Sequence, residues 1–187
     1  MKRFMAIVLF LIAGLSGFAQ SQLPPIDKSP LDISYYPDNY PVLKIQDKVE
    51  GPLMARVIYS RPQKNERIIF GDLIEYGKVW RLGANEATEV EFYVPVKINN
   101  VKIKKGRYSI FAIPNSDKWT LIINRENDTW GSFRYDLKKD IVRMEVPVQK
   151  QAEIAESFSL VFEKTKLGFN LAALWDDVKV TMPVYLQ

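Results

Sequence analysis

The densest group of polar side chains in the sequence falls within one short turn, from residue 81 to residue 88. Arg81, Asn85, Glu86 and Thr88 lie in this turn, and such a density is typical of a binding or catalytic loop. Arg61 ends another predicted strand, in the stretch YSRP. If Arg61 and Arg81 converge, they can hold a carboxylate, phosphate or sulfate through paired hydrogen bonds, while Asn85 and Thr88 add neutral ones. The pattern predicts a site for a small polar or anionic ligand.

A purely structural interpretation of the same cluster is also open. Glu86 can form an ion pair with one of the two arginines, and the cluster, together with Trp80, then fastens a tight turn to the end of a sheet. In that case the polar side chains satisfy one another and leave nothing for a ligand. The sequence alone does not choose between a site and a staple.

Three carboxylates nearby carry an alternative chemistry. Glu89 and Glu91 lie two residues apart on one face of a predicted strand, and Glu86 precedes them. Such pairs, roughly 6 to 7 Å apart, are available as the acid and base of a glycosidase. Alternating glutamates are also the ordinary solvent side of a sheet, and raising the pKa of one of them requires burial. A carbohydrate-active hydrolase using Glu86 with Glu89 or Glu91 is therefore the alternative function.

Aromatic residues offer a third possibility, a flat surface on which a saccharide can stack. Trp130, Phe133 and Tyr135 lie in WGSFRYD, which has the composition of such a platform. A structural role is the alternative for two further tryptophans: Trp119 begins an alternating strand pattern and is then a core residue, and Trp175 precedes two aspartates and then caps the sandwich.

Two absences restrict the chemistry. The sequence has no Cys and no His, so disulfides cannot hold the fold, and the Ser-His-Asp and Cys-His mechanisms are excluded. The usual zinc and copper sites are excluded as well, and no loop has the ligand spacing of a recognised calcium site. We expect no metal and no cofactor, and a binding or interaction module rather than an enzyme.

The N-terminal residues predict export. Lys2 and Arg3 precede an apolar run from Phe4 to Leu15, and small residues follow, which matches a signal peptide spanning residues 1–19. The run is too short for a transmembrane helix, so we expect a periplasmic or secreted chain that does not span the membrane. Residues 20–46 are rich in proline and predict an extended strap or tether, followed by one domain at 47–187.

Charge gives little indication of a macromolecular partner. The chain has 26 Lys plus Arg against 22 Asp plus Glu, and removal of the signal peptide takes away two of the basic residues. The remaining basic residues are interspersed with acids, so no nucleic-acid-binding stripe is expected. The densest basic run, Lys102 to Arg107, is interpreted as the charged edge of a hairpin.

These side chains need a scaffold, and the residues after 46 predict a sheet. Apolar residues alternate over four runs: Val90, Phe92, Val94, Val96 and Ile98; Val142, Met144, Val146 and Val148; Phe158, Leu160 and Phe162; and Val178, Val180, Met182 and Val184. We predict a mostly β fold, a single antiparallel β-sandwich or a flattened jelly-roll-like barrel, with about nine to eleven strands. One or two short helical turns are expected, at 71–77 and 136–140, and residues 149–156 are predicted as a loop or short helix.

Several stretches together resemble a known family. They are YSRP, IFG, YGKVWRLGANEATEVEF, KIKKGRYSIFAIP, WTLIINR and WGSFRYD. In this order, over about residues 55–184, the chain resembles domain-of-unknown-function family 2911, a group of exported bacterial proteins. The resemblance implies a mostly β domain behind a signal peptide and implies no activity. It directs attention to the motif residues Arg61, Trp80, Arg81, Gly83, Asn85, Glu86 and Thr88.

Overall fold

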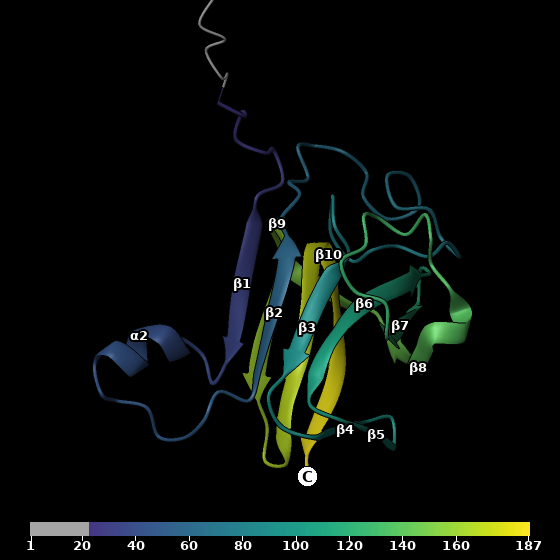
Figure 1. Cartoon of the computed structure of the whole chain (residues 1–187). Helices are drawn as coiled ribbons and strands as arrows, with labels where there is room; N and C mark the ends of the chain where they lie inside the picture. The colour runs from purple at the N-terminus through teal and green to yellow at the C-terminus, as the bar shows by residue number, and fades with distance from the viewer. Residues whose placement is uncertain (1–22) are drawn as a thin grey trace, which may run out of the picture.

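The computed structural model describes residues 23–187, so the predicted signal peptide at 1–19 lies outside the described range. Two antiparallel sheets pack face to face (Figure 1). The larger sheet has the order β1-β2-β3-β6-β7-β8 and the smaller one β5-β4-β10-β9. The ten strands of these sheets confirm the predicted antiparallel sandwich, and they do not close into a barrel in this part of the chain.

The elements follow one another along the chain with few helical residues. The larger sheet contains β1 (Leu31–Tyr36), β2 (Ala55–Ser60), β3 (Thr88–Phe92), β6 (Gly106–Pro114), β7 (Lys118–Asn124) and β8 (Asp140–Pro147). The smaller sheet contains β4 (Val96–Ile98), β5 (Val101–Ile103), β9 (Gln149–Lys164) and β10 (Gly168–Leu186). The helical elements are α2 (Tyr40–Ile45) and the 3-10 helix η2 (Leu137–Lys139).

The core lies between the sheets and is built by the predicted alternating rows. Val90 and Phe92 of the larger sheet pack in one cluster with Phe158, Val180 and Met182 of the smaller one, and all five are buried. Fully burying an apolar side chain of this size contributes about 1.5–3 kcal/mol. The period-two pattern therefore identifies which face of each strand points inward.

The predicted continuous strand from Val90 to Ile98 is in fact two strands in different sheets. β3 ends at Phe92 and β4 begins at Val96. Pro95 lacks a backbone N–H and cannot continue a sheet ladder. The chain therefore crosses from one sheet to the other at residues 93–95, while Val96 and Ile98 stay buried in the same core.

Strand β10 folds back on itself. A straight strand of 19 residues would span about 60 Å, yet the backbone N–H of Leu186 donates to the carbonyl of Leu167 at 3.1 Å. A Cβ added to Gly168 would lie 2.2 Å from the carbonyl oxygen of Val184. The direction reverses near Asp176, whose φ of 54° is left-handed, so both ends of β10 lie at the same end of the sandwich (Figure 1).

The predicted helical turns are partly right. Residues 137–139 form η2, with the side chain of Asp136 capping it through the N–H of Lys138, as expected for 136–140. Residues 71–77 form no helix, because Gly71 adopts φ 94° and the segment closes through the N–H of Gly71 and the carbonyl of Ile74, 2.9 Å apart. The prediction for 149–156 was wrong: these residues form the first half of the edge strand β9, and most of their side chains are exposed, so this half shows no apolar alternation.

Part of the predicted strap belongs to the larger sheet. β1 pairs with β2 in continuous register from Leu31 opposite Ser60 to Tyr36 opposite Ala55. The connection between these strands carries α2, which projects away from the sandwich (Figure 1). Val42 and Ile45 of this helix are exposed. We call residues 37–54 the arm.

The two ends of the sandwich are used below under fixed names. The loop end consists of residues 61–87 and of residues 129–132, which contact them. The hairpin end consists of the connections β4–β5, β5–β6 and β9–β10, together with the C-terminal residues of β10. Residues 23–30 leave the sandwich beside the loop end (Figure 1).

Candidate functional site

The turn predicted as a site holds its own backbone in place. The indole N–H of Trp80 donates to the carbonyl of Gly83 at 2.9 Å. The hydroxyl of Thr88 donates to the carbonyl of Leu82 at 2.6 Å, and the N–H of Thr88 donates to the carbonyl of Arg81 at 3.1 Å. Trp80 and Thr88 are therefore committed to the fold of the turn, in agreement with the structural interpretation of these two side chains.

A second motif of the family pattern closes on this turn. The N–H of Gly131 donates to the carbonyl of Asn85, and the N–H of Ala87 donates to the carbonyl of Thr129, both at 2.9 Å. Glu86 and Trp130 form an isolated bridge between these two bonds. Residues 85–87 and 129–131 thus pair like two short strands, although more than forty positions of sequence separate them.

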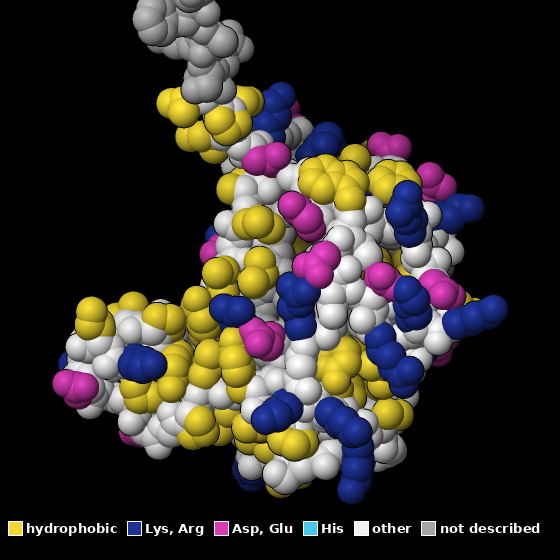
Figure 2. Space-filling model, in the orientation of Figure 1, with side chains coloured by type: hydrophobic (Ala, Val, Ile, Leu, Met, Phe, Trp, Pro, Cys, Tyr) yellow, Lys and Arg dark blue, Asp and Glu magenta, His cyan; other side chains and the backbone are white. Residues whose placement is uncertain are grey.

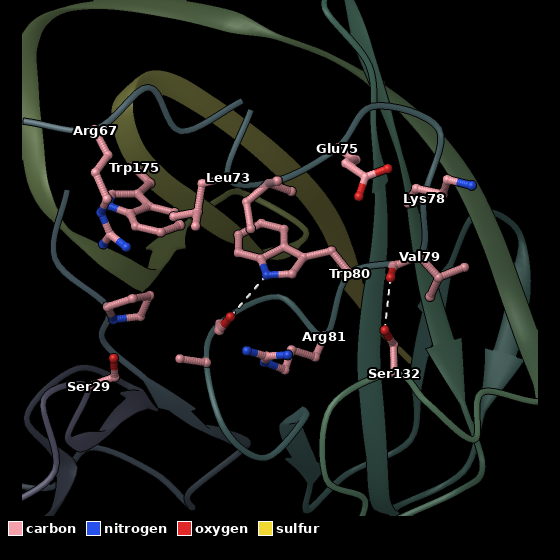
Figure 3. A pocket seen from close by; sticks show the side chains of 14 residues that line it. Ser29, Arg67, Leu73, Glu75, Lys78, Val79, Trp80, Arg81, Ser132 and Trp175 are labelled. Atoms are coloured by element: carbon pink, nitrogen blue, oxygen red, sulfur yellow. Dashed lines mark hydrogen bonds between the residues drawn. The ribbon is translucent and has the colours of Figure 1, made fainter. Parts of the chain in front are cut away.

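A cavity of about 330 Å³ lies between this turn and the preceding segment of the loop end. Its aromatic wall consists of Trp80 and Trp175, whose rings stack with centroids 6.0 Å apart and an interplanar angle of 21°. Figure 3 shows the side chains that surround it. They are Ser29, Pro62, Arg67, Leu73, Ile74, Glu75, Lys78, Val79, Trp80, Arg81, Gly83, Ala84, Ser132 and Trp175.

Arg81 is the unusual member of this lining. Its Nε atom is buried and has no hydrogen-bond partner, and its guanidinium forms no ion pair with any residue from 23 to 187. Burial lowers the pKa of the Arg81 side chain from its ordinary value, because desolvation disfavours the charged form. An arginine nevertheless stays protonated near neutral pH. A positive charge without a counter-charge therefore faces the cavity (Figure 3).

The other charged side chains around the cavity are mostly basic. Arg67 and Lys78 line it and are exposed, and they face a single acid, Glu75. The guanidinium of Arg67 is held by backbone carbonyls, donating to Lys64 at 2.9 Å and also to Gln63. Three basic groups against one acidic group give the cavity a positive field, which favours an anion.

Arg61 does not join Arg81 at the cavity. Its guanidinium donates to Asp32 at 2.9 Å and to the hydroxyl of Ser159 at 3.0 Å. These contacts tie the end of β2 to β1 and β9. The structure therefore separates the two arginines, and Arg61 supports the sandwich.

Glu86 partners neither arginine. Its side chain is exposed and lines a smaller cavity of about 150 Å³ with Glu89 and Asp128. Asn85 adopts a left-handed φ of 55°, a conformation that asparagine tolerates better than most residues. Of the residues in the predicted cluster, Trp80 and Arg81 line the larger cavity.

The remaining two glutamates of the hydrolase alternative are occupied by arginines. Glu89 pairs with Arg107 at 3.4 Å and also accepts the N–H of Asp128 at 2.7 Å. Glu91 pairs with Arg56 at 2.8 Å and accepts the hydroxyl of Tyr93 at 2.8 Å. The structure brings Glu86 and Glu89 to one small cavity and leaves Glu91 outside it.

The predicted aromatic platform is divided. Trp130 and Phe133 are 62% and 82% exposed. Tyr135 is half-buried, and its hydroxyl donates to Asp140 at 2.5 Å and accepts from Arg143 at 2.8 Å. Burial first, and then the hydrogen bond to Asp140, raise the pKa of Tyr135 to about 12. Trp119 and Trp175 are both buried, as a structural role predicts.

Five polar or charged residues of the cavity wall were not among the predicted site residues, namely Ser29, Arg67, Glu75, Lys78 and Ser132. A signal was present, because residues 61–87 form a long segment without a regular strand or helix. Connections longer than about 12–15 residues in compact domains are usually functional or disordered. The hydroxyl of Ser132 donates to the carbonyl of Val79 at 2.9 Å, so a residue from the second motif completes the cavity (Figure 3).

Several further observations bear on the class of protein. In the described range, no three acidic side chains come together closely enough to hold a metal ion, and no helix there could span a bilayer. Comparison with curated proteins and with solved structures gave no match. The model of one family, described as "Protein of unknown function (DUF2911)", matches residues 41–184. The chain therefore belongs to the DUF2911 family of proteins of unknown function.

Proposed function

We propose that this protein is an exported binding protein that holds a small organic anion in the loop-end cavity, with Arg81 as its anchor. One observation carries the proposal: a partly buried guanidinium lines the cavity and has no counter-charge among the residues described. Leaving a buried polar group unpaired costs about 1–3 kcal/mol, and more for a charged one. A ligand that supplies the missing acceptor recovers this free energy.

The chemistry of the walls restricts the ligand. A carboxylate, sulfate or phosphate can accept two parallel hydrogen bonds from one guanidinium. Trp80, Trp175 and Leu73 offer apolar surface near this charge, which suits an organic group attached to the anion. The volume of about 330 Å³ lies at the low end for small-molecule sites. We therefore favour a small apolar carboxylate over a free sugar.

Binding fits the lining better than catalysis does. Among residues 23–187, Glu75 is the only carboxylate on the cavity wall and it is exposed, whereas acid–base hydrolysis of a glycoside uses two. The chain also has no His or Cys to act as a base or nucleophile near neutral pH. The predicted role of the protein is to hold its ligand unchanged.

Export is the second part of the proposal, and it rests on residues 1–19. Their basic start, apolar run and small residues before position 20 match a cleavable signal. Mass spectrometry of the protein isolated from its native host tests this. A mature N-terminus at Gln20 in the periplasmic or secreted fraction supports export; an intact N-terminus in the cytosol contradicts it.

Thermal-shift measurements test the cavity. Benzoate, succinate, sulfate and phosphate are added separately to the wild type, to Arg81→Gln and to Arg125→Gln, which removes an exposed arginine outside the cavity. At about one hundred times its Kd, a bound anion stabilises the folded state by about 2.7 kcal/mol, or roughly 5–10 °C in Tm for a domain of this size. We expect such a rise for wild type and Arg125→Gln and none for Arg81→Gln.

Two outcomes would contradict the proposal. An equal rise in wild type and Arg81→Gln would place the anion elsewhere. A rise with glucose or another neutral sugar, unaffected by Arg81→Gln, would favour a saccharide on the exposed rings of Trp130 and Phe133 instead.

A further inference from the structure

A group of lysines gathers at the hairpin end from three separate segments. Lys102 of β5 lies opposite Lys97 of β4, and Lys97 lies opposite Tyr185 of β10. The N–H of Leu186 donates to the carbonyl of Leu167, which brings in the β9–β10 turn. We call the following residues the lysine surface: Lys97, Lys102, Lys104, Lys105, Lys164 and Lys166.

No lysine of this surface has an acidic partner in the part of the chain that the structure describes. The acid next to Lys164 in sequence, Glu163 of β9, is already paired with Lys179 at 2.6 Å. Arg107, which the sequence groups with this basic run, pairs with Asp128 and Glu89 and so contributes little free charge.

Protection of a sheet edge does not explain the whole surface. Lysines on an edge strand prevent pairing with other chains, and Lys102 in β5 fits this role. Lys97, however, lies in the interior strand β4, directly opposite Lys102, and like charges in opposite positions destabilise a sheet. Lys166 lies in a turn. Such an arrangement is stabilised by an anionic partner.

Apolar side chains protrude among these lysines. Leu167 at the β9–β10 turn is 69% exposed, and Tyr185, Leu186 and Val101 are also exposed. Lys166, Leu167, Pro183 and Tyr185 line a shallow hollow of about 280 Å³. In Figure 2 the lower end of the sandwich shows basic and apolar side chains together. Basic groups around a protruding leucine and a tyrosine are typical of proteins that enter the headgroup region of a bilayer.

We propose that the lysine surface docks the protein on a membrane containing anionic phospholipids. In this orientation, Leu167 enters the headgroup region, the lysines pair with lipid phosphates, and the loop-end cavity faces the solvent on the opposite side. Each lysine close to an anionic bilayer strengthens binding about fivefold. Because these charges are exposed, salt weakens the attraction. The inference is independent of the anion cavity, since Arg81 lies at the other end.

Cosedimentation with vesicles tests the proposal. The purified protein is mixed with vesicles of phosphatidylglycerol and phosphatidylcholine, and with vesicles of phosphatidylcholine alone. We expect binding to the mixed vesicles only, weakened by added salt. Lys104→Glu with Lys105→Glu changes two residues outside the strands and should weaken binding at least about 25-fold, from fivefold for each lysine lost.

A matched control has the same change of net charge elsewhere. Lys28→Glu with Lys138→Glu alters two exposed lysines that form no ion pair with any residue of the described range and lie outside the hairpin end. This variant and Arg81→Gln should bind the mixed vesicles like wild type, whereas Leu167→Ser should weaken binding without altering net charge. Leu167→Ser also keeps the test decisive if the double glutamate variant fails to fold.

Two results overturn the proposal. The first is equal binding by the Lys104/Lys105 variant and the Lys28/Lys138 variant, which would mean that only net charge matters. The second is binding of soluble polyglutamate as tight as that of the vesicles, with no effect of Leu167→Ser on either, which would identify an acidic polymer as the partner instead of a lipid surface.

Discussion

At the loop end the chain runs from residue 61 to residue 87 without a regular strand, whereas the hairpin end joins its strands through two or three residues each time. The long segment encloses a cavity with Arg81 on its wall. The short turns form only a shallow hollow and present their lysines to the outside. A long connection can enclose interior space, whereas a short turn mainly adds surface. The unpaired basic charge is therefore partly buried at the loop end and exposed at the hairpin end.

This comparison separates residues that are adjacent in the sequence. Trp80 packs in the core and Arg81 faces the cavity, although both belong to the same motif. A family motif groups Trp80 and Arg81 together because it is defined by neighbouring positions in the sequence. Trp80 contributes to the core as well as to the cavity wall, whereas Arg81 contributes to the cavity wall and is not part of the core, so substitutions can separate these contributions.

Trp80→Ala should have the largest effect, a loss of about 3–5 kcal/mol in the free energy of unfolding. The Trp80 ring contacts Phe70, Trp119, Phe158 and Trp175, so its removal leaves a hole at the loop end. Urea denaturation measures the change.

The control for this variant is Trp130→Ala, which truncates a tryptophan that is 62% exposed. It should stay within about 0.5 kcal/mol of wild type, as exposed substitutions usually do. Equal losses for both variants would mean that the aromatic cluster does not hold the loop end.

Gly168→Ala probes the hairpin end, with an expected loss of about 1–3 kcal/mol from overpacking. The added Cβ would lie 2.2 Å from the carbonyl oxygen of Val184, so the two halves of β10 would have to separate. Gly51→Ala is the matched control because nothing lies within 4 Å of its added Cβ. Wild-type stability of Gly168→Ala in urea would show that the halves are not held tightly together.

Arg81→Met should raise the stability of the ligand-free protein, by about 1 kcal/mol, because it removes a buried donor that has no partner. Arg61→Met should have the opposite sign and cost up to about 1 kcal/mol, since Arg61 pairs with Asp32 while both side chains remain partly exposed. Thermal unfolding of both variants without ligand provides the comparison. Destabilisation by Arg81→Met would indicate a structural role for this arginine.

At alkaline pH, two tyrosines that donate hydrogen bonds to carboxylates should affect stability. Burial raises the pKa of Tyr93, after β3, to about 12, and Tyr135 is raised equally. An unfolded tyrosine has a pKa of about 10. Their contribution to stability is therefore complete below pH 10 and is lost as pH rises from 10 through 12.

Tyr93→Phe and Tyr135→Phe should each make the loss of stability in this pH range less steep. Urea denaturation at a series of pH values measures the slope. Tyr108→Phe serves as the control, because its hydroxyl donates only to the carbonyl of Lys104. A slope that is unchanged in both tested variants would show that neither phenol is perturbed.

The sequence predicted what depends on local pattern. Alternation identified the inward residues of β3, β8, β9 and β10, because a strand face repeats every second residue. It could not predict that β10 reverses at Asp176, since the inward rows on both sides of the reversal have the same period. The edge strand at 149–156 was not predicted, for a related reason. Most of its side chains are exposed, so it shows no alternating apolar row.

For the candidate site, the sequence indicated the stretch of chain that lines the cavity but not which of its side chains face it. The crowding of polar residues identified the turn at 81–88, and Arg81 was among the candidates. The fate of its neighbours depended on register between distant segments. Arg61 meets Asp32 only because β1 pairs with β2 from Leu31 opposite Ser60. Nothing within the turn indicates that Glu86 would point to solvent and leave Arg81 without a counter-charge.

The projecting arm provides a position at which the protein can be labelled. Residues 23–30 leave beside the cavity and the C-terminus lies on the lysine surface, so a tag at either terminus would disturb one of the two proposed functions. Gln46, at the end of α2, is exposed on the arm, which projects away from the sandwich. Because the chain has no Cys of its own, Gln46→Cys would provide a unique thiol for a fluorophore or surface attachment. Ligand and vesicle binding could then be followed on a single labelled protein.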